Sequence, residues 1–197
     1  YPYGEKESIF AANRHKFSNF SVDYIFVEPD GSWIIGAEYR KEQTNSYEIE
    51  FNDLLVLKVA PDLNRLQWIK RIPKRQTGYQ GFWPYLSYKA FHKHGNVFFL
   101  YNDTFDNHKK STPPEVMTEY AGQKAQVILM QIRSSNGELI KNDLTELVRN
   151  KQVFAIWPSR VWEIMGQSRV AMYGDVVSAQ GNVSSTFVNF SWGSELY

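Results

Sequence analysis

The chain contains no cysteine among its 197 residues, and this absence excludes several kinds of site. Disulfide bonds, zinc or iron–sulfur sites with cysteine ligands, and thiol nucleophiles all require that residue. The absence does not indicate a compartment, because cytosolic proteins and bacterial secreted proteins can both lack cysteine.

Long apolar runs and an excess of either charge are missing as well. No stretch approaches the ~18 consecutive apolar residues that a membrane-spanning helix needs, so we expect a soluble chain without a membrane span. The 22 basic and 21 acidic residues give a net charge of +1. This balance argues against the basic surface of a nucleic-acid-binding protein, and we expect no nucleic-acid partner.

Signatures of common catalytic and cofactor sites are also missing. The chain has no nucleophile elbow, no phosphate-binding glycine loop and no dinucleotide-binding fingerprint. We therefore predict no cofactor and no bound metal, and the absences favour a non-catalytic function without excluding an enzyme. The chain begins with Tyr1 and shows no signal peptide, so we interpret it as a mature or truncated product.

Aromatic residues are the compositional excess, at 16% of the chain. Phe, Tyr and Trp favour the half-buried, pleated surfaces of β-sheets. The clearest pair of strands spans residues 52–73, where an apolar run at 54–59 is followed by turn residues at 61–64 and a second run at 66–72. Together these features predict antiparallel β structure.

The same pattern recurs along the chain. Hairpins centred on Gly31, Gly95 and Gly166 are each followed by a loop and a third strand, and the first two also by a fourth. The predicted organisation is a leading segment over residues 1–21, which could supply a strand of a preceding or closing blade, followed by blade-like units over 22–77, 78–151 and 152–197, the last incomplete.

A four-stranded meander exposes both faces if it stands alone, so successive units must stack. The pattern over residues 22–192 resembles a divergent β-propeller repeat protein, of the kind found in uncharacterised secreted or surface proteins of bacteria, particularly Bacteroidota. The Trp-Asp repeat, the double glycine of kelch blades and the aspartate box of sialidase-like blades are absent. The resemblance implies an all-β partial propeller of about three blades, and an extracellular, cell-surface or periplasmic location.

Three blades are fewer than the four to eight that typically close a propeller. We expect the missing blades in an N-terminal portion or a partner chain, so that more polypeptide is needed to close the fold. In a second arrangement, residues 8–12 supply the last strand of the third unit. The alternative fold is a β-sandwich or open barrel in one domain.

An acidic residue lies near the end of each returning hairpin strand: Glu38, Asp103 and Asp175. In a propeller these side chains would lie at one rim, where they could bind a divalent cation or act as the acid and base of a glycoside hydrolase. The interpretation that the sequence favours is simpler: polar residues mark where each strand leaves the core.

Aromatic residues also cluster before the second and third units. Tyr79, Phe82 and Trp83 lie on one predicted loop, and Trp157 lies on another. Loop aromatics on a rigid β scaffold are suited to holding sugars or extended peptides, so these four are the ligand-binding candidates. Packing between neighbouring blades is the alternative, which their recurrence favours.

Two further clusters are interpreted as solvated. His92 and His94 are assigned to a hairpin tip, and the basic run over residues 70–75 to the end of a strand. The chain is therefore predicted to be a non-catalytic binding or scaffold module of a bacterial surface or secreted protein, recognising a glycan or protein through loop aromatics. The alternatives are a propeller-type glycoside hydrolase that uses the rim carboxylates and a structural subunit of a larger assembly.

Overall fold

The computed structural model describes most of the chain, with gaps between strands and at both ends. The predicted strand at residues 8–12 and the turn at Gly166 lie outside the described part. The described residues are 19–42, 48–104, 107, 125–144, 153–164, 169–177 and 182–191.

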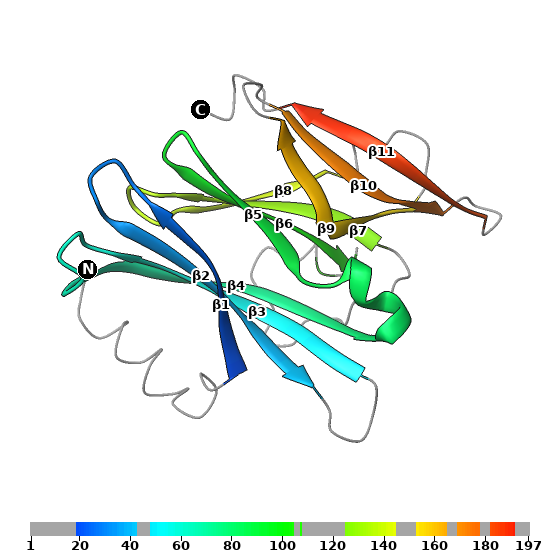
Figure 1. The fold of residues 1–197 in the computed structure, drawn as a ribbon, viewed down its shortest axis with the longest axis horizontal. Helices are drawn as coiled ribbons and strands as arrows, with labels where there is room; N and C mark the ends of the chain where they lie inside the picture. The colour runs from blue at the N-terminus through cyan, green and yellow to red at the C-terminus, as the bar shows by residue number, and fades with distance from the viewer. Residues whose placement is uncertain are drawn as a thin grey trace.

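These residues form eleven strands and one 3-10 helix, η2, and the strands group into three antiparallel sheets (Figure 1). Sheet 1 has the order β1-β2-β3-β4, sheet 2 the order β5-β6-β7-β8, and sheet 3 the order β11-β10-β9. The bounds are β1 Phe20–Val27, β2 Trp33–Glu42, β3 Glu48–Val59, β4 Leu66–Tyr79, η2 Gln80–Tyr85, β5 Tyr88–Lys93, β6 Asn96–Thr104, β7 Ala125–Arg133, β8 Leu139–Asp143, β9 Val153–Ile164, β10 Arg169–Val177 and β11 Val183–Ser191.

The prediction of an all-β fold made of stacked antiparallel meanders is confirmed. The turn glycines Gly31 and Gly95 adopt positive φ angles of 80° and 69°, as tight hairpins require. Strands β2, β6 and β10, which return from the three predicted hairpins, belong to three separate sheets. The described strands do not close into a ring, and they form one sheet more than a β-sandwich has. The division into blade-like units as domains stays a prediction.

Strands β3 and β4 run farther than the apolar pattern indicated. Their pairing shifts register between Asn52 and Leu54, opposite the segment that contains Pro73. Such a bulge accommodates proline, which cannot donate to the ladder, and lets the strands continue to Glu48 and Tyr79. The basic run over residues 70–75 therefore lies within β4 and not at its end, which corrects the sequence interpretation.

Sheet 2 lies between the other two sheets and is covered on both faces (Figure 1). Every residue of β6 is buried. Its side chains alternate between two cores, with Phe99 and Tyr101 packed toward sheet 1 and Phe98 and Leu100 packed toward sheet 3. The structure thus explains why residues 97–101 of β6 form a continuous apolar run.

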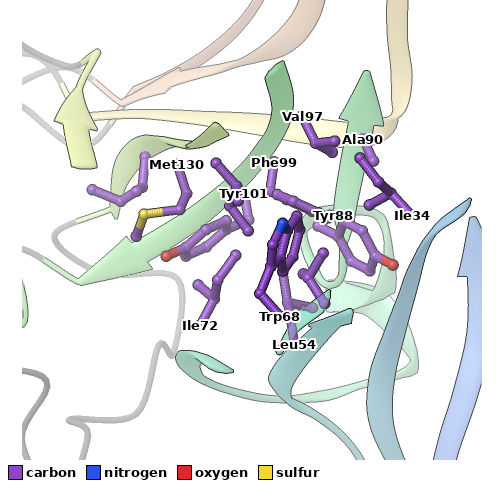
Figure 2. Close-up of a cluster of buried hydrophobic side chains, with 13 residues drawn as sticks. Ile34, Leu54, Trp68, Ile72, Tyr88, Ala90, Val97, Phe99, Tyr101 and Met130 are labelled. Carbon is purple, nitrogen blue, oxygen red and sulfur yellow. The ribbon is translucent and has the colours of Figure 1, made fainter. Parts of the chain in front are cut away.

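The core between sheets 1 and 2 is rich in aromatic side chains (Figure 2). Trp68 of β4 lies among Tyr88, Phe99 and Tyr101 of sheet 2, and its indole Nε1 donates a hydrogen bond of 2.9 Å to the carbonyl of Ser134. Much of the aromatic excess is therefore used to pack one sheet on another, as the sequence indicated.

The outer face of sheet 1, turned away from this core, is also apolar. Three side chains of β1, Val22, Ile25 and Val27, are each more than half exposed there. A sheet that is apolar on both faces is normally covered on both. By strand register this face carries Val22, Ile25 and Val27 of β1, Trp33, Ile35 and Ala37 of β2, Leu55, Leu57 and Val59 of β3, and Ile69 of β4.

Candidate functional site

The three predicted rim carboxylates do not lie at a solvent-facing rim. Glu38 lies on β2, Asp103 on β6 and Asp175 on β10, and their relative exposures are 0%, 1% and 6%. These acids are therefore enclosed in the fold, and their candidate catalytic role stays a prediction. A buried carboxylate is stable only if its oxygens find partners, so their contacts explain their positions.

Glu38 is held by groups from three directions. Its Oε1 lies 2.7 Å from the Lys74 ammonium, and its Oε2 accepts hydrogen bonds from Arg40 Nε at 3.0 Å and Ser87 Oγ at 2.6 Å. Ser87 belongs to the segment that leads into sheet 2, so this carboxylate links sheets 1 and 2.

Lys74 is the cation of this buried pair, although the sequence assigned it to a solvated strand end. Its ammonium also donates to the Phe51 carbonyl at 2.9 Å and to Gln76 Oε1 at 2.8 Å. Loss of hydration lowers the pKa of Lys74, against the opposing effect of Glu38. The charged pair is thus fully enclosed in protein.

Hydrogen bonds continue from this pair to sheet 3. Gln76 Nε2 donates to the Asn102 carbonyl at 2.7 Å. The Asn102 side chain then donates to the Ile156 carbonyl at 2.7 Å and accepts from the Ile156 amide at 2.9 Å. Asn102 therefore bridges sheets 2 and 3 at the middle of the stack. The candidate residue that the sequence pattern indicates here is its neighbour Asp103.

Asp103 is buried beside the end of β6. Its Oδ1 accepts hydrogen bonds from the Thr104 amide at 2.8 Å and from Asn107 Nδ2 at 2.6 Å. Its Oδ2 accepts none from the residues that the structure describes. Burial raises the pKa of Asp103, and these hydrogen bonds only partly oppose the rise.

Asp175 on β10 joins sheet 3 to the segment before sheet 2. Its Oδ1 accepts from Ser185 Oγ at 2.6 Å, and its Oδ2 accepts from Trp157 Nε1 at 3.1 Å and from the Tyr85 hydroxyl. Desolvation raises the pKa of Asp175, but the hydrogen bonds from Ser185, Tyr85 and Trp157 outweigh it and lower the pKa. In the described part of the chain, none of the three acids lies in a group of three or more His, Asp or Glu side chains that could hold a metal ion.

Five aromatic rings lie along the face of sheet 3 that contains Asp175, and we call them the aromatic strip: Tyr85, Trp157, Tyr173, Phe187 and Trp162. The first four pack edge to face in that order. Their ring centroids are 5.8 Å apart for Tyr85 and Trp157, 5.1 Å for Trp157 and Tyr173, and 5.0 Å for Tyr173 and Phe187. Phe187 and Trp162 are 6.4 Å apart, with their planes inclined by 32°. The edge-to-face contacts fix the orientation of each ring.

Side-chain alternation places the strip on the solvent side of sheet 3. Val170 and Met172 of β10 point into the core, whereas Tyr173 between Met172 and Gly174 points outward and pairs with Phe187 of β11. Phe187 is 66% exposed and Trp162 is 44% exposed. These two large apolar side chains therefore form an exposed platform at one end of the strip.

The four predicted loop aromatics lie on three different elements, β4, η2 and β9. Trp157 lies within β9, where a register shift opposite Tyr173 directs its indole to Asp175, so its assignment to a loop is wrong. Tyr79 ends β4, and Trp83 lies on η2, and both are exposed. Only the backbone of Phe82 is described. Their predicted role in ligand binding stays a prediction.

An open cleft of about 550 Å³ lies where the first strands of the three sheets approach one another. Trp162 of β9 belongs both to this cleft and to the aromatic strip. His92, assigned to a solvated tip, lines the cleft, stacks on Phe26 and contacts the Glu28 carboxylate. The lining residues are Ile25, Phe26 and Val27 of β1, Lys89, Ala90, Phe91 and His92 of β5, and Val161, Trp162 and Glu163 of β9.

Comparison with protein-family models, curated proteins and solved structures finds no match. In the part of the chain that the structure describes, no helix has the length and hydropathy needed to cross a bilayer.

The enclosed Lys74–Glu38 pair predicts a large effect on stability. Lys74→Met leaves the Glu38 charge buried without its main partner, so we expect it to lower the free energy of unfolding by ~3–5 kcal/mol. The double variant Lys74→Met/Glu38→Gln should lose less free energy of unfolding than the sum of the losses in the two single variants. Urea denaturation measures both, with the exposed Lys41→Met on β2 as the control. Additive costs, or a cost for Lys74→Met no larger than that for Lys41→Met, would contradict the assignment.

The lowered pKa of Asp175 predicts a defined pH dependence. Because the folded chain releases this proton at lower pH than the unfolded chain, the stabilisation is present above the ordinary value of 3.8 and is lost as the pH falls through the folded value. Asp175→Asn should therefore cost ~1–3 kcal/mol near pH ~7, and the difference from the wild type should shrink near pH ~3. A difference that stays constant or grows on acidification would show that Asp175 is not stabilised as an anion.

Proposed function

We propose that the chain is a non-catalytic binding module that takes a glycan on the aromatic strip of sheet 3. The observation that carries this proposal is the platform formed by Trp162 of β9 and Phe187 of β11, which lie on either side of β10 and are left open to solvent. Aromatic rings present flat apolar surfaces with a fixed orientation, and they suit the apolar faces of sugar rings.

Polar groups beside the strip support a saccharide ligand. Ser185 of β11 is exposed on the same face as Phe187, and its hydroxyl is oriented by Asp175. Tyr85 and Trp157 contact the same carboxylate at the far end of the strip. Alternating apolar rings and hydroxyl groups match a ligand whose surface is itself a mixture of C–H faces and hydroxyls. A glycan ligand would agree with an extracellular, cell-surface or periplasmic setting.

The buried acids favour binding over hydrolysis. A glycoside hydrolase needs two carboxyl groups that face one substrate. Glu38 is enclosed by Lys74, Arg40 and Ser87, and Asp103 and Asp175 lie in two other sheets. Glu38 and Asp175 join different parts of the stack, and Asp103 is buried beside its own chain neighbours, so the hydrolase alternative is not the function that we propose.

Glycan binding should depend on the exposed rings of the strip. We expect the chain to bind neutral oligosaccharides on a glycan array, and Phe187→Ala and Trp162→Ala each to weaken binding by at least about tenfold, which corresponds to ~1.4 kcal/mol. Tyr79→Ala removes an exposed aromatic ring from the end of sheet 1 and is the matched control. Because Phe187 and Tyr79 are exposed, both variants should unfold within ~0.5 kcal/mol of the wild type.

Titration calorimetry on the array hits gives the affinities. Absence of binding to any saccharide would contradict the proposal. So would an equal loss of affinity in Tyr79→Ala, because the recognition surface would then not be the strip.

A second candidate is a scaffold role through the outer face of sheet 1. Its exposed aliphatic side chains on β1 resemble those that sheet 1 presents to sheet 2 on its inner face. Arg71 and Asp53, which are ion-paired at 2.7 Å, bring both charge signs to this face. The occupant that we propose is a second copy of the chain, because a two-fold contact needs only one self-complementary surface. In that case more polypeptide completes the stack.

Light scattering coupled to size exclusion tests this second candidate. We expect twice the 23.0 kDa mass of one chain, and a return to one chain in Ile25→Ser. A wild-type monomer at all accessible concentrations would contradict it.

A further inference from the structure

The cleft between β1, β5 and β9 continues the proposed binding surface. Trp162 of β9 lines the cleft and also contacts Phe187 of the aromatic strip at 6.4 Å. A ligand that lies on the Trp162–Phe187 platform therefore reaches the mouth of the cleft. Its volume of about 550 Å³ is within the ~300–1,000 Å³ of small-ligand sites.

The charges in and beside this cleft are unequally compensated. The Glu163 carboxylate lies 3.1 Å from the Lys93 ammonium. Glu28 contacts His92 and lies 3.9 Å from Lys58. Each of the two acids thus already has a cationic partner within the cleft or at its border.

Lys89 is different, because none of the described residues forms a hydrogen bond or ion pair with its ammonium group. It lies on β5 in register with Leu100 of the buried strand β6, so its backbone is rigid. It is half-buried and lines the cleft together with residues of β1 and β9. A partly dehydrated cation without an anionic partner attracts an anion supplied by a ligand.

We infer that the cleft recognises the carboxylate of an acidic sugar, with Lys89 as the cation and Trp162 as the stacking surface. This inference rests on the proposed glycan function and names the class of saccharide. The ligand is then an oligosaccharide that carries uronate or a similar acidic residue, with one acidic residue in the cleft and the neighbouring sugar residues on the strip.

The test compares acidic oligosaccharides with their own carboxyl-reduced, neutral forms. Oligogalacturonides and alginate oligosaccharides are the probes, and titration calorimetry at low salt is the measurement. We expect the wild-type chain to bind at least one acidic form about tenfold more tightly than its reduced form, and added salt to remove most of this preference.

Variants separate this inference from the proposed function. Lys89→Gln should abolish the preference for the acidic form while neutral binding is kept, and Lys89→Arg should retain the preference. Lys41→Gln, an equal change of charge at the exposed end of β2, should have no effect. Thermal unfolding of each variant verifies that the fold is intact.

The outcomes are distinguishable. If neutral oligosaccharides bind on Phe187 but reduction of the carboxyl group changes nothing, or Lys89→Gln keeps the preference, the inference is overturned and the proposed function stands. If no saccharide of either kind binds, both are overturned.

Discussion

The structure depends on the burial of sheet 2 between two other sheets. All nine residues of β6 are buried, and their side chains alternate between one core shared with sheet 1 and another shared with sheet 3. A sheet of this composition has no solvent face, so it cannot exist without both neighbours. Polar groups trapped inside such a stack must be paired with one another. The buried Lys74–Glu38 pair and the Asn102 side chain satisfy this requirement between successive sheets.

Because of this constraint, the polar residues that stabilise the stack are different from the exposed residues that are available to a ligand. The acids that resemble catalytic groups in the sequence are buried inside the stack, where Glu38 and Asp175 accept hydrogen bonds from other strands or segments and Asp103 accepts them from its own chain neighbours. Among the residues that the structure describes, open surfaces include the outer faces of sheets 1 and 3 and the cleft between the first strands. They differ in chemistry: sheet 1 presents aliphatic side chains, whereas sheet 3 presents aromatic rings beside hydroxyl groups. For this reason we propose the ligand function for sheet 3 and the assembly function for sheet 1.

The architecture could be predicted from the sequence because its signals are local. Gly31 and Gly95 mark tight hairpins between alternating apolar runs. A meander that stands alone would expose both of its faces, so the sequence also predicts that successive meanders stack. The site could not, because its determinants are distant in sequence. Lys74 is buried only because Glu38, 36 positions earlier, lies opposite it after a bulge at Pro73. The alternation of side chains along β10 indicates that Tyr173 and Met172 lie on opposite faces of the strand. In a stack of sheets, however, either face can be internal. The pattern alone therefore did not distinguish a binding platform from a packing surface.

Hydrogen exchange with and without a bound oligosaccharide tests most directly whether cohesion and recognition lie on different parts of the stack. The account predicts that amides of β6 and β7 exchange most slowly in both states, through global unfolding only. Added ligand should slow exchange in β9 and β11 and leave β2 and β3 unchanged. Fast exchange in β6, or ligand protection centred on the buried Glu38 strand, would contradict it.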